Sequence, residues 1–301
     1  MKKKTYLFAL MAMALTLGSC SDNENGIGGE TSKYITVSTS IGNMTRVATD
    51  EKGGQTFEEG DEISVYAWTG DATVAPETRE RVVNNAINKL TNGSWVSTPQ
   101  MLWKNNRDKH YFIGVYPISA ISDLSAGEYT FDVNKQTESD LLVAVNKDGL
   151  SYNVDEQQTV PLTFTHVMAK LVVNLTYKNQ WGTEGPTVDK VAVGNAAKEA
   201  TINYLTKVVT PSTTAKEDFS LPEITENTKY VSVIIPQEEV TQLTIVIGGK
   251  NFVYDNGTPF KLESGKITTV NLEVGRDEIK LGDVKITNWE DGSTFSGEAL
   301  N

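Results

Sequence analysis

Tyr34-Ile35-Thr36-Val37-Ser38-Thr39-Ser40-Ile41 is a run in which apolar or β-branched side chains alternate with polar ones. One face of the run carries Ile35, Val37, Thr39 and Ile41. Successive side chains of a β-strand point to opposite faces of its sheet, so a period of two is typical of a strand with one buried face. The run therefore predicts a β-strand that covers an apolar core.

Most other apolar segments alternate in the same way and are bounded by Gly, Asn, Asp or Pro, which is typical of an all-β protein. The predicted strands cover residues 63–68, 111–116, 129–133, 140–145, 160–177, 188–193, 200–205, 231–235, 243–247, 251–254, 268–274, 279–281 and 284–286. A helix stays open for residues 76–90, because Pro76 suits a first helical turn. Asn92-Gly93 favours instead a hairpin between strands at residues 87–90 and 95–97.

Short strands at spacings of about 8 to 12 residues, in two halves of the chain, predict two tandem β-sandwiches. We expect an N-terminal domain at residues 34–163 and a C-terminal domain at residues 164–301. The boundary falls inside the long apolar segment at residues 160–177.

Residues 1–19 have the composition of a signal peptide. Three lysines precede an apolar stretch from Tyr6 to Leu17, which is shorter than the roughly 20 residues that span a bilayer. Cys20 follows Gly18 and Ser19, an arrangement that resembles a bacterial lipobox, whose cysteine is diacylated and becomes the first mature residue. An ordinary secretory signal with an incidental cysteine is the alternative. Residues 20–33 are polar and contain glycine, and they predict a lipidated tether.

The charge of the chain limits its partners. Removal of residues 1–19 leaves 24 basic against 39 acidic residues, a net charge of −15. Such a surface repels nucleic acid and anionic lipid heads, so neither is an expected partner. Cys20 is the only cysteine. Its lipidation leaves no thiol for a disulfide, a metal site or a nucleophile.

The sequence carries no catalytic motif. His110 and His166 each stand alone, without the spacing of a metal-binding pair. His166 lies between Phe164 and Met168 of a predicted strand, so we expect a packed side chain bonded to the backbone. A nucleophile elbow, a P-loop and a dinucleotide-binding fingerprint are all missing from the sequence. We therefore expect no enzyme activity, no catalytic residue, no metal and no cofactor.

The tryptophans raise an alternative hypothesis, a sugar-stacking platform on a surface glycan-binding lipoprotein. They are Trp68, Trp95, Trp103, Trp181 and Trp289. Most of them lie within or next to predicted strands, where filling a core is the simpler interpretation. A cluster of exposed tryptophan faces would favour the glycan-binding hypothesis.

Several motifs, taken in order, resemble the Bacteroidales fimbrillin family, the subunits of type V pili. They are the lipobox at Cys20, Thr45-Arg46, Phe57-Glu58-Glu59-Gly60-Asp61 with Ile63 to Tyr66, Gly93-Ser94-Trp95 with Trp103, Phe112 to Pro117, Asp140-Leu141-Leu142-Val143-Ala144, Phe164 to Leu171, and Ile286-Thr287-Asn288-Trp289. The resemblance implies two transthyretin-like β-sandwich domains. It also implies export as a surface-exposed lipoprotein of the outer membrane, and a place in a fimbrium after processing.

The resemblance further implies a mechanism of assembly. An arginine-specific protease cuts between Arg46 and Val47 and so removes the first strand with its inward residues Ile35, Val37, Thr39 and Ile41. The vacated groove then takes a donor strand from another pilus subunit, in a homo- or hetero-polymer. The C-terminal region is the natural donor, and its apolar residues are Ile279, Leu281, Val284 and Ile286. An uncut first strand would prevent premature assembly.

Overall fold

The computed structural model describes residues 33–42 and 56–289, apart from residues 157, 183–184, 241, 255–258 and 278. Within these residues the chain is almost entirely β-structure. The exceptions are one short α-helix and two 3-10 turns, α1 (Gln136–Ser139), Thr78–Glu80 and Asn179–Trp181. The all-β prediction is confirmed. No helix in the described ranges has the length and hydropathy needed to cross a membrane.

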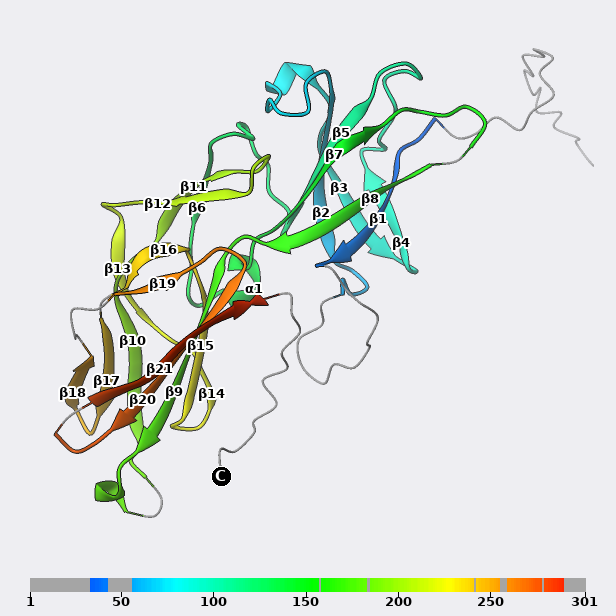
Figure 1. Ribbon diagram of the computed structural model, residues 1–301. Helices are drawn as coiled ribbons and strands as arrows, with labels where there is room; N and C mark the ends of the chain where they lie inside the picture. The colour runs from blue at the N-terminus through cyan, green and yellow to red at the C-terminus, as the bar shows by residue number, and fades with distance from the viewer. Residues whose placement is uncertain are drawn as a thin grey trace, which may run out of the picture.

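The first sheet has seven strands in the order β1-β8-β7-β5-β2-β3-β4 (Figure 1). Its strands are β1 (Thr36–Ile41), β2 (Glu62–Thr69), β3 (Arg81–Thr91), β4 (Ser94–Thr98), β5 (His110–Tyr116), β7 (Leu142–Leu150) and β8 (Thr159–His166). All neighbouring pairs in this sheet are antiparallel except β1 and β8, which are parallel. β1 is thus an edge strand that is far in sequence from its only ladder partner.

The remaining strands form four smaller sheets. A five-stranded sheet has the order β14-β15-β9-β20-β21, and a four-stranded sheet has the order β13-β10-β17-β18. Two further sheets have the orders β12-β11-β6 and β16-β19. These strands are β6 (Gly127–Thr130), β9 (Ala169–Tyr177), β10 (Val188–Ala197), β11 (Glu199–Asn203), β12 (Val208–Pro211), β13 (Lys216–Ser220), β14 (Glu223–Thr225), β15 (Lys229–Ile234), β16 (Gln237–Val240), β17 (Leu243–Ile247), β18 (Lys250–Tyr254), β19 (Phe260–Leu262), β20 (Lys266–Val274) and β21 (Ile279–Asn288).

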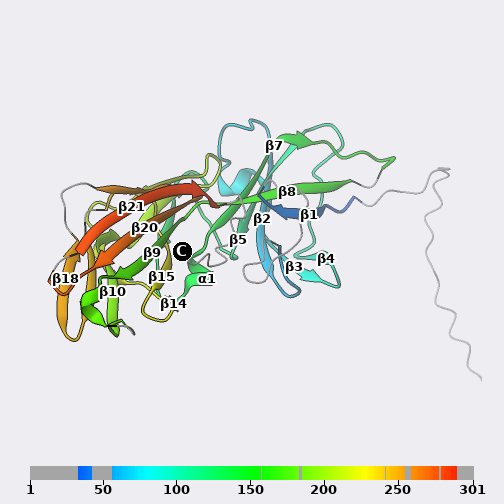
Figure 2. The same ribbon diagram turned by 60° about the horizontal axis from the view of Figure 1, so that its bottom comes forward.

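Two views place the seven-stranded sheet in one lobe and most of the other strands in a second lobe (Figures 1 and 2). β8 ends at His166 and β9 begins at Ala169, so a very short connection joins the two lobes. β6 lies between β5 and β7 in the sequence, but it is not part of the seven-stranded sheet and pairs with β11 instead. A division of the chain at residue 163, and transthyretin-like sandwiches on either side of it, stay predictions.

Asn92-Gly93 forms the predicted hairpin. Thr91 of β3 pairs with Ser94 of β4, and the two residues between them have φ angles of 51° and 74°. Positive φ at both positions is the type I′ geometry that Asn-Gly favours. The helix considered for residues 76–90 is limited to a 3-10 turn at Thr78–Glu80, and β3 follows at once.

The central strands of the seven-stranded sheet are buried on both faces. On β2, Ile63, Val65 and Ala67 belong to one hydrophobic cluster, whereas Tyr66 and Trp68 belong to a larger one that continues into the second lobe. This two-sided burial explains why β2 is a nearly continuous apolar run. The smaller cluster is the one that β1 covers.

Close packing in the smaller cluster depends on a glycine of β5. A Cβ built on Gly114 would lie 2.7 Å from Phe164 Cζ and 3.2 Å from Leu162 Cδ1, both on β8. Phe164 and Leu162 are 0% and 1% exposed, so neither ring nor methyl can move into open space. Gly114 therefore leaves room for the Phe164 and Leu162 side chains, which reach across β7 onto β5.

We predict that Gly114→Ala lowers the free energy of unfolding by about 1–3 kcal/mol, because the added methyl overpacks this core. Thermal denaturation followed by circular dichroism measures the change. The matched control is Val96→Ala, because Val96 of β4 is 54% exposed and its truncation should change stability by less than about 0.5 kcal/mol. Equal midpoints for the two variants would contradict the expectation.

Candidate functional site

β1 covers the smaller hydrophobic cluster with one face. Its residues Val37 and Ile41 are 6% and 7% exposed, and Ile35, just before the strand, is 2% exposed. All three belong to the cluster that also holds side chains of β2, β5 and β8, namely Ile63, Val65, Ala67, Phe112, Val160, Leu162 and Phe164. On the opposite face, the Ser40 hydroxyl donates to Thr163 Oγ1 at 3.2 Å in an exposed position. The alternation in the sequence thus corresponds to a buried and a solvated face.

The backbone of this segment is also bonded on the side away from β8. The Ile35 N–H donates to the Met101 carbonyl at 2.9 Å, and the Trp103 N–H donates to the Lys33 carbonyl at 3.2 Å. Met101 and Trp103 lie after β4, at the opposite end of the seven-strand order. The N-terminal segment therefore spans the opening between the two ends of the sheet and encloses the cluster.

Thr39 differs from the other inward residues of β1. It is half-buried, and its hydroxyl accepts a hydrogen bond from the Trp95 indole N–H at 3.0 Å. Trp95, Met101 and Trp103 are partners of the first strand that the sequence analysis missed. Two of the three act through backbone groups, which leave no signal in a sequence.

The burial of the three side chains Ile35, Val37 and Ile41 gives an estimate of how much free energy the first strand contributes to the stability of the lobe. At about 1.5–3 kcal/mol for each buried aliphatic side chain, they stabilise the lobe by on the order of 5–9 kcal/mol. This value is an upper estimate, because an unfolded chain already buries some apolar surface. Removal of β1 also deprives the edge of β8 and the Met101 carbonyl of their partners. Without β1 the lobe therefore has an open apolar cluster beside an unpaired strand edge.

The predicted processing residues lie beyond the described end of β1. The Gly42 N–H still donates to the Phe164 carbonyl at 2.8 Å, and residues 43–55 are outside the described ranges. These include Arg46 and Val47. Cys20, the signal peptide at residues 1–19 and nearly all of the tether are outside as well. Lipidation and cleavage at these residues stay predictions.

The predicted donor residues lie on β21, at the edge of the five-stranded sheet. β21 runs antiparallel to β20 (Figure 1), and its four apolar residues face residues of β20 as follows: Ile279 faces Val274, Leu281 faces Leu272, Val284 faces Val270 and Ile286 faces Thr268. Ile279 and Leu281 pack half-buried against the larger cluster. Val284 and Ile286 are 37% and 39% exposed. The strand thus has an anchored first half and a more exposed second half.

A β-bulge separates these halves. Between Leu281 and Val284, two residues of β21 stand opposite the single residue Asn271 of β20. Asn271 Nδ2 donates to Asp283 Oδ1 at 2.6 Å and so holds the bulge. Directly opposed residues of paired strands share a face, so the extra residue keeps all four apolar side chains on one side of the sheet.

Trp289 fixes the end of β21 against β8. Its ring is 8% exposed and stacks on His166, with centroids 4.1 Å apart and planes at 5°. The backbone N–H of Trp289 donates to the Gly265 carbonyl at 3.0 Å. His166 Nδ1 lies 2.9 Å from Asp140 Oδ1. The expectation of a backbone partner for this packed histidine is therefore wrong, because the carboxylate of Asp140, between α1 and β7, occupies that place.

A lysine completes this cluster. Lys170 Nζ lies 5.3 Å from the centroid of the Trp289 ring, within the range of a cation–π contact. Burial lowers the pKa of Lys170 from its ordinary value, and the nearby Asp140 carboxylate opposes that shift. The Trp289 ring is thus held by a stack on His166 of β8 and by a cation–π contact with Lys170 of β9.

The second histidine, His110, also has partners within the fold. The ring of His110 accepts the Lys104 N–H at 3.0 Å through Nε2, and burial lowers the pKa of this histidine. No group of three or more His, Cys, Asp or Glu side chains in the described part of the chain could hold a metal ion. His110 is thus held within the fold by backbone groups of Lys104 and Asp108.

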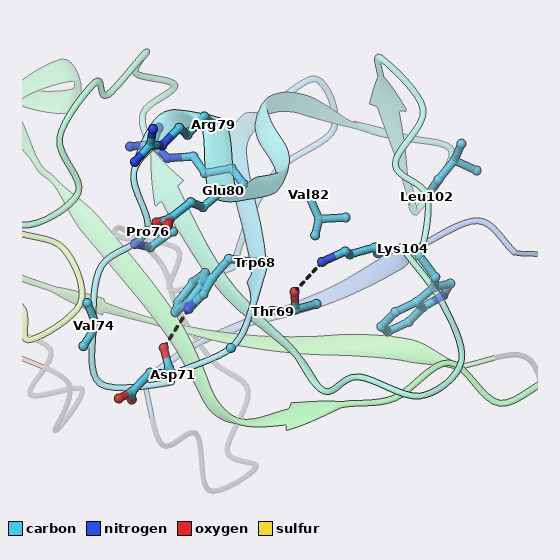
Figure 3. Close-up of a pocket in the computed structure, with 13 residues that line it drawn as sticks. Trp68, Thr69, Asp71, Val74, Pro76, Arg79, Glu80, Val82, Leu102 and Lys104 are labelled. Atoms are coloured by element: carbon cyan, nitrogen blue, oxygen red, sulfur yellow. Dashed lines mark hydrogen bonds between the residues drawn. The ribbon is translucent and has the colours of Figure 1, made fainter.

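An open hollow of about 800 Å³ lies between the end of β2 and the connection after β4 (Figure 3). The Trp68 indole N–H donates to the Asp71 carbonyl at 2.9 Å, and Lys104 Nζ donates to Thr69 Oγ1 at 3.1 Å. Trp68 is 2% exposed, so its ring offers no face to a ligand. The other four tryptophans are buried or half-buried. The described residues thus provide no exposed tryptophan platform for sugars.

We predict that Trp289→Ala loosens β21 by on the order of 3 kcal/mol, because the buried ring and its stack on His166 are lost. Hydrogen–deuterium exchange of the amides at residues 279–288 should become faster. Val284→Ala is the control on the same strand, because Val284 is exposed and should leave exchange nearly unchanged. Unaltered exchange in Trp289→Ala would show that the stack does not hold the strand.

Several known proteins are similar to this chain in sequence or in fold. A curated relative from Bacteroides uniformis, a proposed fimbrium subunit named Fim1C, is 24% identical over 313 aligned residues that cover 97% of each chain. A crystal structure of a candidate cell adhesion protein from Bacteroides uniformis has a TM-score of 0.64 at 20% identity and covers 86% of this chain and 100% of that one. Another, from Bacteroides ovatus, has a TM-score of 0.63 at 17% identity and covers 85% and 98%. These two structures show the same fold.

The sequence profile of the fimbrillin-like family matches residues 45–289. This range begins just after β1 and ends at Trp289, and it includes both the groove that β1 fills and the whole of β21. The chain belongs to the fimbrillin-like family.

Proposed function

We propose that this fimbrillin-like chain is a structural subunit of a type V pilus that polymerises by donor-strand exchange. Cleavage after Arg46 removes the first strand of each subunit, and a strand from a neighbour takes its place. The observation that carries the proposal is the position of β1, an edge strand whose inward residues, apart from the half-buried Thr39, are nearly fully buried. The family match that begins at Thr45, next to the proposed cut, supports it.

Loss of β1 creates an acceptor groove. Val160, Leu162 and Phe164 of β8 form part of its floor, and the free edge of β8 supplies unpaired backbone groups. An extended peptide can add to such an edge through main-chain hydrogen bonds while its side chains fill the apolar positions. A β-strand is the kind of segment that fits this groove.

β21 suits the role of donor because it is itself an edge strand. It has one ladder neighbour, β20, and its residues Val284 and Ile286 are incompletely buried on their own subunit. Transfer of these side chains into a groove gains apolar burial that the monomer lacks. A covered edge also makes release slow, so the polymer is kinetically stable.

The N-terminal segment controls when this happens. A diacylated Cys20 holds the precursor on the outer membrane surface through the tether at residues 20–33. The uncut β1 occupies the groove during export. An arginine-specific protease then removes lipid and strand together, and the subunit joins other pilus subunits in a fimbrium. One cut therefore releases the subunit and activates it.

We predict that Arg46→Ala blocks both processing and assembly. Mass spectrometry of the protein from the surface of its own cells should find Val47 as the N-terminus of the natural chain. The variant should retain an acylated Cys20 and form no SDS-resistant ladder. Arg107→Ala is the matched control, because Arg107 is an exposed arginine in the connection before β5 and its loss should leave processing intact. A ladder built from uncut Arg46→Ala subunits would contradict the proposal.

We predict that a disulfide between β20 and β21 abolishes polymerisation. Thr269 and Lys285 are directly opposed. Opposed residues of an antiparallel pair have Cα atoms about 4.5–5.5 Å apart, a separation that a disulfide spans. A chain that begins at Val47 has no natural cysteine. Thr269→Cys with Lys285→Cys should polymerise only after reduction with dithiothreitol.

The control for this experiment links β17 and β18, which are not proposed to move. Thr244 and Val253 are opposed in that hairpin, so Thr244→Cys with Val253→Cys forms a comparable disulfide. This control should polymerise in both redox states. Polymerisation of the oxidised β20–β21 variant would exclude β21 as the donor.

A further inference from the structure

We propose that β21 donates only its second half, with Val284 and Ile286 entering the acceptor groove and Ile279 and Leu281 remaining on the donor's own core. This inference rests on the proposed function and specifies the register of the exchanged strand. It follows from a mismatch between the spacing of the apolar residues in β1 and in β21.

The acceptor groove requires a regular strand. β1 pairs with β8 without interruption from Thr36 opposite Thr159 to Ile41 opposite Phe164. Its inward positions, at Ile35, Val37, Thr39 and Ile41, are therefore spaced by two throughout. A donor that restores this ladder presents every second residue to the core.

β21 does not have this spacing. Its apolar residues occur at 279, 281, 284 and 286, with an interval of three in the middle. On the monomer the bulge corrects the interval, and Asn271 of β20 holds it through Asp283. A strand that leaves β20 also leaves Asn271, so in the groove its two halves face opposite sides. Only one half can be inward.

Charge decides which half enters. Of the four sets of alternate residues within β21, those starting at 279 and 281 both include Asp283 and Lys285, and the set starting at 280 includes Lys280. The set Gly282, Val284, Ile286 and Asn288 has no charge. A carboxylate in an apolar groove without a partner is strongly unfavourable, so the odd-numbered face is excluded. The set that starts at Lys280 is not excluded, because Lys280 could extend its amine to solvent. This set also places Val284 and Ile286 inward.

The register places these two residues at the centre of the groove. When Gly282 to Asn288 occupies the four positions, Val284 and Ile286 take those of Val37 and Thr39, whichever way the strand runs. Gly282 and Asn288 take the ends, and Asp283 and Lys285 face solvent. Val284 and Ile286 then make most of the new apolar contact at a junction.

The burial in the monomer agrees with this assignment. Val284 and Ile286 are 37% and 39% exposed and do not pack against the larger cluster, so their departure costs the donor less than that of Ile279 and Leu281 would. Ile279 and Leu281 pack against the larger cluster, and keeping them there fixes the base of the donated segment. The part of β21 before the bulge, with Ile279 and Leu281, thus anchors the strand, and the part after it, with Val284 and Ile286, enters the groove.

An assay of a single junction tests the register with full-length mature chains. The acceptor begins at Val47 and carries the oxidised Thr269→Cys and Lys285→Cys disulfide, so it accepts a strand but cannot donate one. The donor begins at Ser21 and carries Arg46→Ala, so β1 fills its groove and it can only donate. Mixing gives one 1:1 complex, whose dissociation constant is measured by size-exclusion chromatography and native mass spectrometry.

Two donor variants should behave in opposite ways. Val284→Ser with Ile286→Ser should weaken the junction by about 100-fold or more and lower the donor's own thermal midpoint less than the other pair does. Ile279→Ser with Leu281→Ser should lower the donor's midpoint and change the junction by less than about threefold. A junction that depends on Ile279 and Leu281, or equally on both pairs, would overturn the register. Failure of the unsubstituted pair to associate would overturn the strand-exchange proposal itself.

Alkylation gives a second readout that does not depend on the stability of these variants. The donor from Ser21 has no natural thiol. In the complex, the thiol introduced by Val284→Cys should resist iodoacetamide, whereas that introduced by Asp283→Cys should react as in the free donor. The reverse pattern would place the odd-numbered face in the groove and overturn the inference.

Discussion

The parallel ladder between β1 and β8 is the interaction on which the rest of the molecule depends. β1 reaches across to the carbonyl of Met101, after β4, and so joins the two ends of the seven-strand order. Without it, the cluster around Phe164 is open on one side and the edge of β8 is unpaired. A short segment therefore closes this lobe, and it is distant in sequence from β8, its partner. A strand placed in this way can be exchanged without refolding the remainder of the sheet.

The same physical forces hold β1 in place and make its vacated site attractive. Burial of apolar side chains and pairing of main-chain groups are insensitive to which chain supplies the strand. Specificity must then come from spacing and charge. β1 meets the requirement through strict alternation, and β21 meets it only on one side of its bulge. Asp283 and Lys285, which flank Val284, disfavour the wrong face, and Val284 with Ile286 favours the right one.

Much of this arrangement could be predicted from the sequence, and the remainder depends on contacts that a sequence does not encode. Alternation identified β1, and Asn92-Gly93 identified the hairpin, because both are local patterns with one physical meaning. The parallel direction of β1, the bond of Ile35 to Met101 and the bond of Lys33 to Trp103 involve backbone groups of distant segments, so side-chain identity gives no signal. The interval of three in β21 is visible in the sequence. Its interpretation as a bulge requires Asn271 opposite Asp283, and this pairing is known only from the fold.

β8 connects the two strands that the proposed exchange would move. Phe164 faces Ile41 of β1, and two residues later His166 supports the Trp289 ring at the end of β21. Once β1 leaves, β8 becomes the edge of its sheet, and edge strands open more readily than central ones. We expect the end of β8, with His166 in it, to become less firmly held, which weakens the support under Trp289. Loss of the first strand would then ease the release of the last, because both strands contact β8, while β21, as an edge strand, can also leave a subunit that still holds β1.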